Sequence, residues 1–192
     1  YAPAYREVAE IHYQRKDGAG AVKYFEQYLR RIERNDKDQT RYAFFLFMAR
    51  EFTKANAVFR EVTQGEGVNP MTLRYYGYSL NEAGEWAESQ KAFQRYFAAT
   101  PQADAADYAY YGKLLIKLNE DSVAVANLGR SLDLNKQQPD VTRLLAETQL
   151  KRRKYPEAAE AYRQVFATSR PQSQDYYSYG RACYFSQQFA QA

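Results

Sequence analysis

Cysteine, histidine and long apolar runs are scarce in this sequence of 192 residues. Cys183 is the only cysteine, which excludes an internal disulfide framework and a cysteine-based zinc site. We expect it to be a small buried hydrophobe, because it lies on the inward face of a predicted helix. No stretch approaches the ~20 apolar residues that a membrane-spanning helix needs, so no membrane span is expected in this segment.

The single histidine is also expected to be structural. His12 occupies the position that Leu46, Leu80 and Leu115 hold in later segments, which predicts a packed or half-buried ring. The G-x-x-x-x-G-K motif of a phosphate-binding loop is missing as well. We therefore expect no catalytic residue, no metal site, no cofactor and no enzymatic activity.

Aromatic residues are abundant, with 19 Tyr and 11 Phe, and 45% of the residues are hydrophobic. Such a composition excludes global disorder. The net charge of +4 is a mild excess, which favours acidic partners without requiring nucleic acid.

Small residues recur along the chain with a period of about 34 residues. Two helices that cross at close range need small residues at the crossing, because larger side chains push the axes apart. One series of small residues lies twelve residues before the other, and a bulky residue precedes each of its members. The earlier series is Ala9, Ala43, Gly77, Gly112, Ala146 and Gly180, and the later one is Ala21, Ala55, Ser89, Ala124, Ala158 and Ala192.

This period is typical of helix-turn-helix repeats, and the chain resembles a tetratricopeptide-repeat array over essentially all its residues. The resemblance implies an all-α fold, a right-handed superhelical solenoid of antiparallel helix pairs. No pair can enclose its own apolar face, so each repeat is stabilised mainly by its neighbours. We expect a single array with repeats at about 2–35, 36–69, 70–104, 105–138 and 139–172, followed by a partial repeat at 173–192.

Prolines and turn residues set the expected helix limits. Pro70 and Pro139 suit a first helical turn, where the missing N–H would be unpaired anyway. The opening Tyr1-Ala2-Pro3-Ala4-Tyr5 resembles a junction between repeats, so the chain is expected to be a fragment of a longer protein. The predicted helices are 3–15 with 18–34, 36–49 with 52–65, 70–83 with 86–98, 105–118 with 121–134, 139–152 with 155–168, and 173–186.

In the family that the sequence resembles, the first helices of successive repeats line a concave groove, and outward positions on them bind the ligand. By register, this groove is aromatic and mainly cationic. It suits a protein or peptide with carboxylates and aromatic or apolar side chains, since Arg can hold a carboxylate with two hydrogen bonds. The candidate binding residues are Arg6, Phe44, Phe47, Arg74, Tyr78, Lys113, Arg143, Tyr177, Arg181 and Tyr184.

Alternatives remain open for several of these residues. Phe44, Phe47 and Tyr184 could equally pack on adjacent repeats, because most apolar residues at helical spacing belong to the core. The Lys-Asn pair with which some family members clamp a C-terminal carboxylate is missing, and Arg143 is followed by Glu147 at that spacing. The basic run 151–154 fits a solvated turn after a helix C-terminus, or a site for phosphate or acidic protein.

The resulting hypothesis is a protein–protein interaction scaffold that holds a peptide segment or protein surface in its concave groove. The alternative is a structural spacer or oligomerisation module of a larger bacterial envelope or secretion protein. Binding of RNA would call for a repeated base-reading code, whereas the groove positions vary irregularly, so no nucleic acid is expected. The composition, rich in Tyr, Gln and Ala, is typical of bacteria and leaves cytoplasm and periplasm open.

The last predicted helix carries aromatic residues with little sequence left to cover them. Tyr176, Tyr179, Cys183 and Tyr184 share its apolar side. We expect this face to be exposed or to contact another chain, which makes self-association through the C-terminal end a further hypothesis.

Overall fold

The computed structural model describes residues 1–187, which form eleven α-helices and contain no strand. The fold is therefore all-α, as predicted from the sequence. The helices are α1 (Ala2–Gln14), α2 (Gly18–Leu29), α3 (Asp36–Met48), α4 (Phe52–Val62), α5 (Pro70–Glu82), α6 (Trp86–Ala99), α7 (Ala105–Lys117), α8 (Asp121–Leu134), α9 (Pro139–Lys151), α10 (Tyr155–Thr168) and α11 (Ser173–Phe185).

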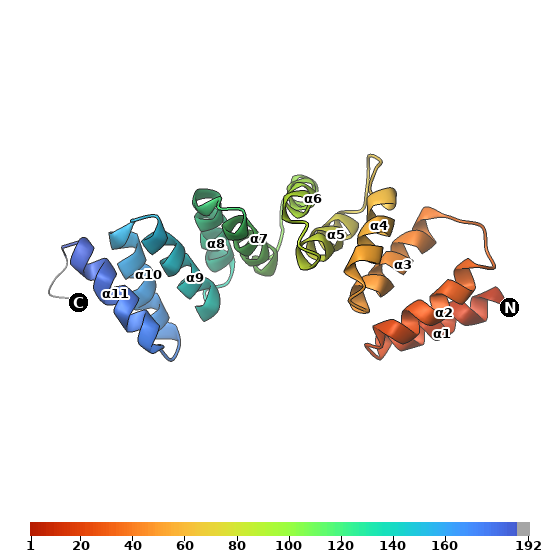
Figure 1. The fold of residues 1–192 in the computed structure, drawn as a ribbon, viewed down its shortest axis with the longest axis horizontal. Coiled ribbons are helices and arrows are strands. Elements are labelled where there is room, and N and C mark those ends of the chain that lie inside the picture. The colour runs from red at the N-terminus through yellow and green to blue at the C-terminus, as the bar shows by residue number, and fades with distance from the viewer. Residues whose placement is uncertain (188–192) are drawn as a thin grey trace. The chain divides into compact units, whose positions relative to one another are not determined.

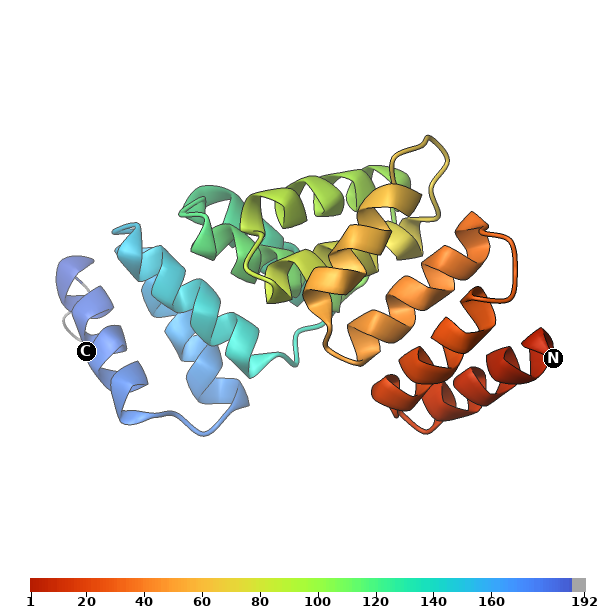
Figure 2. The same ribbon diagram turned by 45° about the vertical axis from the view of Figure 1, so that its right-hand side comes forward.

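The chain divides into two compact units, Tyr1–Pro101 and Gln102–Ala192. In the first unit, α1 packs on α2, α3 on α4 and α5 on α6, and the second helix of each pair contacts the first helix of the next (Figure 1, Figure 2). In the second unit, α7 packs on α8 and α9 on α10, and α11 lies against α10 and α9. Each unit is thus a stack of helix pairs.

The small residues lie where the two helices of a pair cross. Ser89 of α6 reaches α5 so closely that its hydroxyl donates a 2.7 Å hydrogen bond to the Gly77 carbonyl oxygen. A Cβ at Gly77 would lie 2.8 Å from the Phe93 ring, and one at Gly112 would lie 2.7 Å from Leu128. The predicted series are therefore buried crossing positions, except Gly180, whose surroundings are open, and Ala192, which lies outside the described residues.

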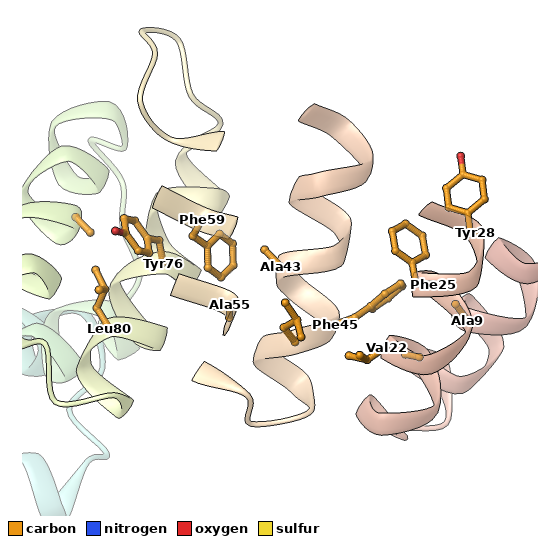
Figure 3. Close-up of a cluster of buried hydrophobic side chains, with 13 residues drawn as sticks. Ala9, Val22, Phe25, Tyr28, Ala43, Phe45, Ala55, Phe59, Tyr76 and Leu80 are labelled. Carbon is orange, nitrogen blue, oxygen red and sulfur yellow. The ribbon is translucent and has the colours of Figure 1, made fainter. Parts of the chain in front are cut away.

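Aromatic side chains fill the space between neighbouring pairs of the first unit (Figure 3). Phe25 of α2 meets Phe45 of α3 edge to face with ring centroids 4.9 Å apart, and Phe59 of α4 lies 5.8 Å from Tyr76 of α5. A buried ring of this kind removes roughly 150–250 Å² from water. The same contacts that stabilise a repeat therefore also join it to the next.

The core of the second unit is more aliphatic. Leu128 packs with Val141, and Tyr162 packs with Ala146. Cys183 of α11 is fully buried against the alanines of α10. The expectation of a small buried hydrophobe at Cys183 is confirmed.

First helices end in one recurring turn. In the first pair, Lys16 has a φ of +60°, and the next N–H, that of Asp17, donates to the carbonyl oxygen of His12 five residues earlier. This pattern is a Schellman motif, which satisfies the last carbonyl groups of a helix. The turn residues with positive φ are Lys16, Arg50, Gly84, Asn119, Arg153 and Gln187.

Two second helices end earlier than predicted. α2 stops at Leu29 instead of residue 34, because Asn35 is needed as the cap of α3, where its side chain accepts the N–H of Asp38 at 2.9 Å. α4 stops at Val62 instead of residue 65, and Gly67 follows with a φ of +70°. The other helix ends differ from the prediction by at most one residue, which is within the usual uncertainty of helix limits.

His12 is packed, as its position in the repeat predicted. Its ring stacks on Tyr24 with centroids 5.0 Å apart, and its Nδ1 lies 2.8 Å from Oδ2 of Asp17. Asp17 also accepts the N–H of Gly20 and so caps α2. The hydrogen bond from Gly20, aided by His12, lowers the pKa of the Asp17 carboxyl.

Candidate functional site

A groove of about 400 Å³ lies between the first helices α7 and α9 of the second unit. Both helices contribute charged side chains to it, and each also contributes one aliphatic side chain. The lining residues are Lys113, Ile116, Lys117, Asp140, Arg143, Leu144 and Glu147.

The α7 wall of this groove is basic. Lys113 and Lys117 lie four residues apart, so they share one face of the helix, and both are exposed. Ile116, between them in sequence, is half-buried and faces the same groove. The α7 wall therefore carries two positive charges beside an apolar surface.

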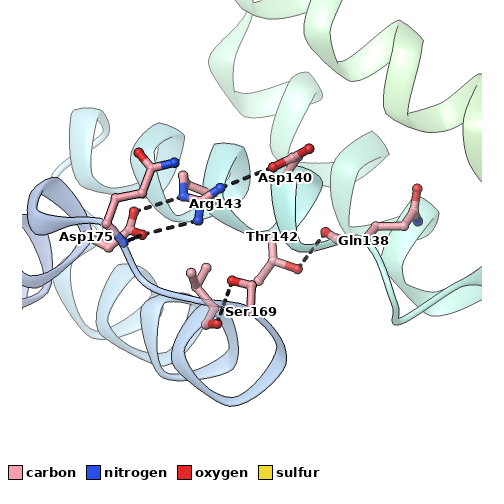
Figure 4. A network of polar contacts seen from close by, with 8 residues as sticks. Gln138, Asp140, Thr142, Arg143, Ser169 and Asp175 are labelled. Carbon is pink, nitrogen blue, oxygen red and sulfur yellow. Dashed lines mark hydrogen bonds and ion pairs between the residues drawn. The ribbon is translucent and has the colours of Figure 1, made fainter.

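Arg143 is held by the protein itself (Figure 4). Its Nε and Nη2 donate to the two carboxylate oxygens of Asp175 at 2.9 and 3.2 Å, and its Nη1 donates to Asp140 at 3.1 Å. The Arg143 side chain is 15% exposed and that of Asp175 only 2%. The hydrogen bond from Arg143 to Asp175 raises the pKa of the guanidinium, so the charge persists but is neutralised within the unit.

Glu147 completes the α9 wall. Burial raises the pKa of its carboxyl; Arg143 opposes this rise and the charge of Asp175 adds to it. Leu144, one turn earlier, is half-buried and, like Ile116, lines the groove and packs on the apolar cluster beneath it. An apolar floor thus separates a basic wall from a wall on which acidic groups predominate.

The predicted aromatic residues of the first unit pack on one another. Phe44 meets Phe59 and Tyr75 edge to face, with centroids 5.7 and 4.9 Å apart. Phe47 lies 5.8 Å from Phe52 and 5.4 Å from Tyr75. Both predicted residues are half-buried, so they stabilise the contact between α3, α4 and α5.

The predicted arginines of this unit also have partners. Arg74 Nε donates to the Tyr78 hydroxyl at 3.2 Å, and the guanidinium lies over the Tyr78 ring. Burial raises the pKa of Tyr28, its hydrogen bond to Asp38 adds to the rise, and the nearby Arg6 opposes it. Arg6 and Arg74 are therefore part of the packed surface of the unit.

On α11, three predicted residues share an exposed face. Tyr177 is 62% and Tyr184 61% exposed, and the Arg181 guanidinium lies 5.8 Å from the Tyr177 ring centre. The expected apolar side of α11 is only partly open, because Cys183 faces α10 and is fully buried. The prediction that Cys183 belongs to an uncovered face is wrong.

The basic run 151–154 lies at the end of α9 and in the turn that follows. Lys151 is paired with Asp121 at 2.7 Å, and Arg152 donates to the Ser122 hydroxyl at 3.0 Å. These contacts with the start of α8 agree with the solvated-turn interpretation.

Sequence reasoning missed part of the groove. Lys117 could have been predicted, because its spacing of four residues from Lys113 places both on one face of α7. Asp140 and Leu144 line the groove from the α9 face that turns toward α7. Asp175 lies 32 residues after Arg143. Its role could not be derived from spacing, because it depends on how α11 packs against α9.

Residues 1–187 contain no cluster of three or more His, Cys, Asp or Glu side chains suited to a metal ion. Within the same residues, no helix combines the length and the apolar character needed to cross a membrane.

Residues 112–184 match the tetratricopeptide-repeat family model, whereas no curated protein sequence matches the chain. The fold is similar to that of MamA (41-end) from Desulfovibrio magneticus RS-1, with a TM-score of 0.77 and 18% identity over 87% of this chain and 94% of that one. It is also similar to PilF from Pseudomonas aeruginosa, with a TM-score of 0.68 and 18% identity over 100% of this chain and 86% of that one.

A third similar structure is YrrB, described as a tetratricopeptide-repeat protein with an unusual peptide-binding site. Its TM-score is 0.74, with 15% identity over 89% of this chain and 88% of that one. The resemblance found in the sequence is confirmed by the family-model match over 112–184 and by the fold, which is of the tetratricopeptide-repeat type. Proteins of this type generally mediate protein–protein interactions, and the fold is typically a scaffold without enzymatic activity.

Proposed function

Because the chain has the tetratricopeptide-repeat fold, we propose that it is an interaction scaffold that binds a peptide segment of a partner protein in the α7–α9 groove. Recognition relies on shape, apolar contact and charge, without covalent chemistry. The surrounding helices hold the groove in place, since α7 and α9 are each packed on a second helix.

The groove itself is the observation that carries this proposal. Its volume of about 400 Å³ lies in the range of roughly 300–1,000 Å³ that is common for ligand sites. Ile116 and Leu144 provide apolar surface, and the charged walls would fix the orientation of a peptide. The fold similarity to YrrB, described as having a peptide-binding site, adds support.

A groove variant tests the proposal. Ile116→Glu with Lys113→Glu places two carboxylates in the groove, so we expect loss of a partner captured from a bacterial lysate by the unchanged chain. The control is Lys23→Glu, an exposed position on α2 outside the groove. Circular dichroism must show that all variants are folded. Equal capture by the groove variant and the control would contradict the proposed site.

A second candidate is the structural module, favoured by the exposed aromatic residues of α11. Tyr176, Tyr177 and Tyr184 are each about 60% exposed, and surface of this kind is typical of contacts between chains. Sedimentation of the chain over a range of concentrations tests it. If the chain is a monomer at all concentrations, self-association through α11 is excluded. If the chain forms a dimer and the double variant Tyr177→Ser, Tyr184→Ser does not, self-association through α11 is supported.

A further inference from the structure

The two walls of the α7–α9 groove differ in charge. On α7, Lys113 and Lys117 contribute two positive charges. On α9, Arg143 contributes one positive charge, and Asp140 and Glu147 two negative charges. Asp175 adds a third negative charge directly behind the guanidinium, so the α9 side has three acids against one base.

The ion pair of Arg143 enlarges this difference. The lining residues of α9 alone hold two acids against one base, but an unpaired guanidinium among them would still accept a ligand carboxylate. Both of its hydrogen-bonding edges are instead occupied, because Nε and Nη2 face Asp175 and Nη1 faces Asp140. A ligand carboxylate could pair with the Nε edge of Arg143 only by displacing the carboxylate of Asp175. That side chain is only 2% exposed, so it is not easily displaced.

We propose that this groove selects a peptide in which an apolar side chain lies between an acidic flank and a basic flank. The apolar side chain rests on Ile116 and Leu144, the acidic flank faces Lys113 and Lys117, and the basic flank faces Glu147 and Asp140. The inference rests on the proposed function, because it names the ligand chemistry of the same groove. It adds a basic flank to the ligand with carboxylates and aromatic or apolar side chains that the register of the sequence predicts.

Charge complementarity supports this occupant over the alternatives. A peptide with two acidic flanks would meet Glu147 and Asp140 with like charge, and a peptide with two basic flanks would meet the lysines. Like charges placed opposite one another at an interface select against the wrong partner. The dipolar peptide alone finds an opposite charge on both walls.

Three helical peptides with the same leucine stripe provide the test. One carries Glu along one edge of the stripe and Lys along the other, the second carries Glu along both edges, and the third carries Lys along both. We expect the dipolar peptide to bind the unchanged chain about fivefold more tightly than either of the others, because two exposed charge pairs contribute about 1 kcal/mol together. The preference should shrink as salt is added.

Wall variants then make the preference switch. Lys113→Glu with Lys117→Glu makes both walls acidic and should transfer the preference to the all-Lys peptide. Asp140→Lys with Glu147→Lys makes both walls basic and should transfer it to the all-Glu peptide. Isotope-labelled chain reports binding through shifts of the α7 and α9 amide resonances, and circular dichroism shows whether each variant is folded.

The outcomes separate the two proposals. Preference of the unchanged chain for the all-Glu or all-Lys peptide in the groove overturns the dipolar inference and leaves the groove as a peptide site. The dipolar inference is also overturned if both wall variants still prefer the dipolar peptide. If none of the three peptides shifts the amide resonances of α7 and α9, the proposed function of the groove is overturned as well.

Discussion

Gly18 lies where the start of α2 meets the end of α3. A Cβ at this position would lie 2.5 Å from the Ala49 nitrogen and 2.6 Å from the Met48 carbonyl carbon. Both are backbone atoms, so α2 and α3 would have to move apart. Gly18→Ala should therefore lower the free energy of unfolding by roughly 1–3 kcal/mol, the usual cost of overpacking, as measured by urea denaturation.

Gly129 is the matched control, because a Cβ there meets no heavy atom within 4 Å. It lies inside α8, where Ala is a better helix former than Gly by about 1 kcal/mol. Gly129→Ala should therefore stabilise the chain. Similar effects of the two substitutions would show that close approach at Gly18 is not what limits that position.

Glu147 should make stability depend on pH. The pKa of its carboxyl is raised in the folded protein, so the folded state binds more protons than the unfolded chain between the two pKa values. Stability is then lost as pH rises through that interval. Glu147→Gln should raise the melting temperature at neutral pH and have no effect at a pH well below both values, where the carboxyl is protonated in either state.

Loss of a negative charge anywhere on a cationic chain could change stability, so a control is needed. Glu7→Gln removes the same charge from α1, away from Arg143, Asp175 and the α7–α9 groove. If Glu7→Gln stabilises the chain as much as Glu147→Gln does, or if the effect of Glu147→Gln persists at low pH, the raised pKa of the Glu147 carboxyl is not the cause.

Among the helices, α9 and α11 are joined by the ion pair of Arg143 and Asp175 in addition to apolar contacts. Arg143→Met leaves the Asp175 carboxylate, 2% exposed, with only the N–H of Gln172 as a partner among the contacts described. Removing one member of a buried pair costs about 3–5 kcal/mol. We expect a loss of this size in urea denaturation and faster amide exchange along α11.

Adding Asp175→Asn to Arg143→Met removes the stranded charge and should recover part of the loss. Arg163→Met is the control, because Arg163 pairs with Glu160 on the surface of α10 at 3.0 Å, and exposed pairs contribute at most about 1 kcal/mol. Equal losses in Arg143→Met and Arg163→Met would disprove the structural role of the Arg143 pair.

The helices were predictable from the sequence because their signals are local. Pro70 and Pro139 begin α5 and α9 as expected, and the small residues mark the crossings. The end of α2 was misplaced because its limit depends on Asn35, which caps the following helix. The neutralised Arg143 could not be predicted, since its partner comes from a helix that approaches only after α9, α10 and α11 have packed. Lys113, a candidate by its register in the repeat, lines the α7–α9 groove, and its role in binding stays a prediction.

For the whole chain, each compact unit is expected to fold by itself. Repeats are stabilised mainly by their nearest neighbours, and the segments 1–101 and 102–187 keep every helix pair within a unit intact. Each segment should show helical circular dichroism and a cooperative thermal transition, and 102–187 should retain peptide binding in the α7–α9 groove. The expectation of one continuous array over residues 1–192 stays a prediction.

A segment cut inside a pair provides the comparison. Residues 1–84 lack α6 and therefore lose the hydrogen bond from Ser89 to Gly77. This segment should melt at a lower temperature than 1–101. An unfolded 1–101 or 102–187 would show that the units depend on each other for stability.

The turn that ends each first helix also bears on how such a gene can change. The positive-φ residues of this turn recur at intervals of 34 or 35 from Lys16 to Gln187, and their side chains are as different as Lys, Gly and Asn. The turn is therefore set by the backbone pattern and accepts many different side chains at this position. Unequal recombination between two repeats at this position would rejoin compatible turns, so whole repeats could be gained or lost in a lineage without a change of reading frame or of local geometry.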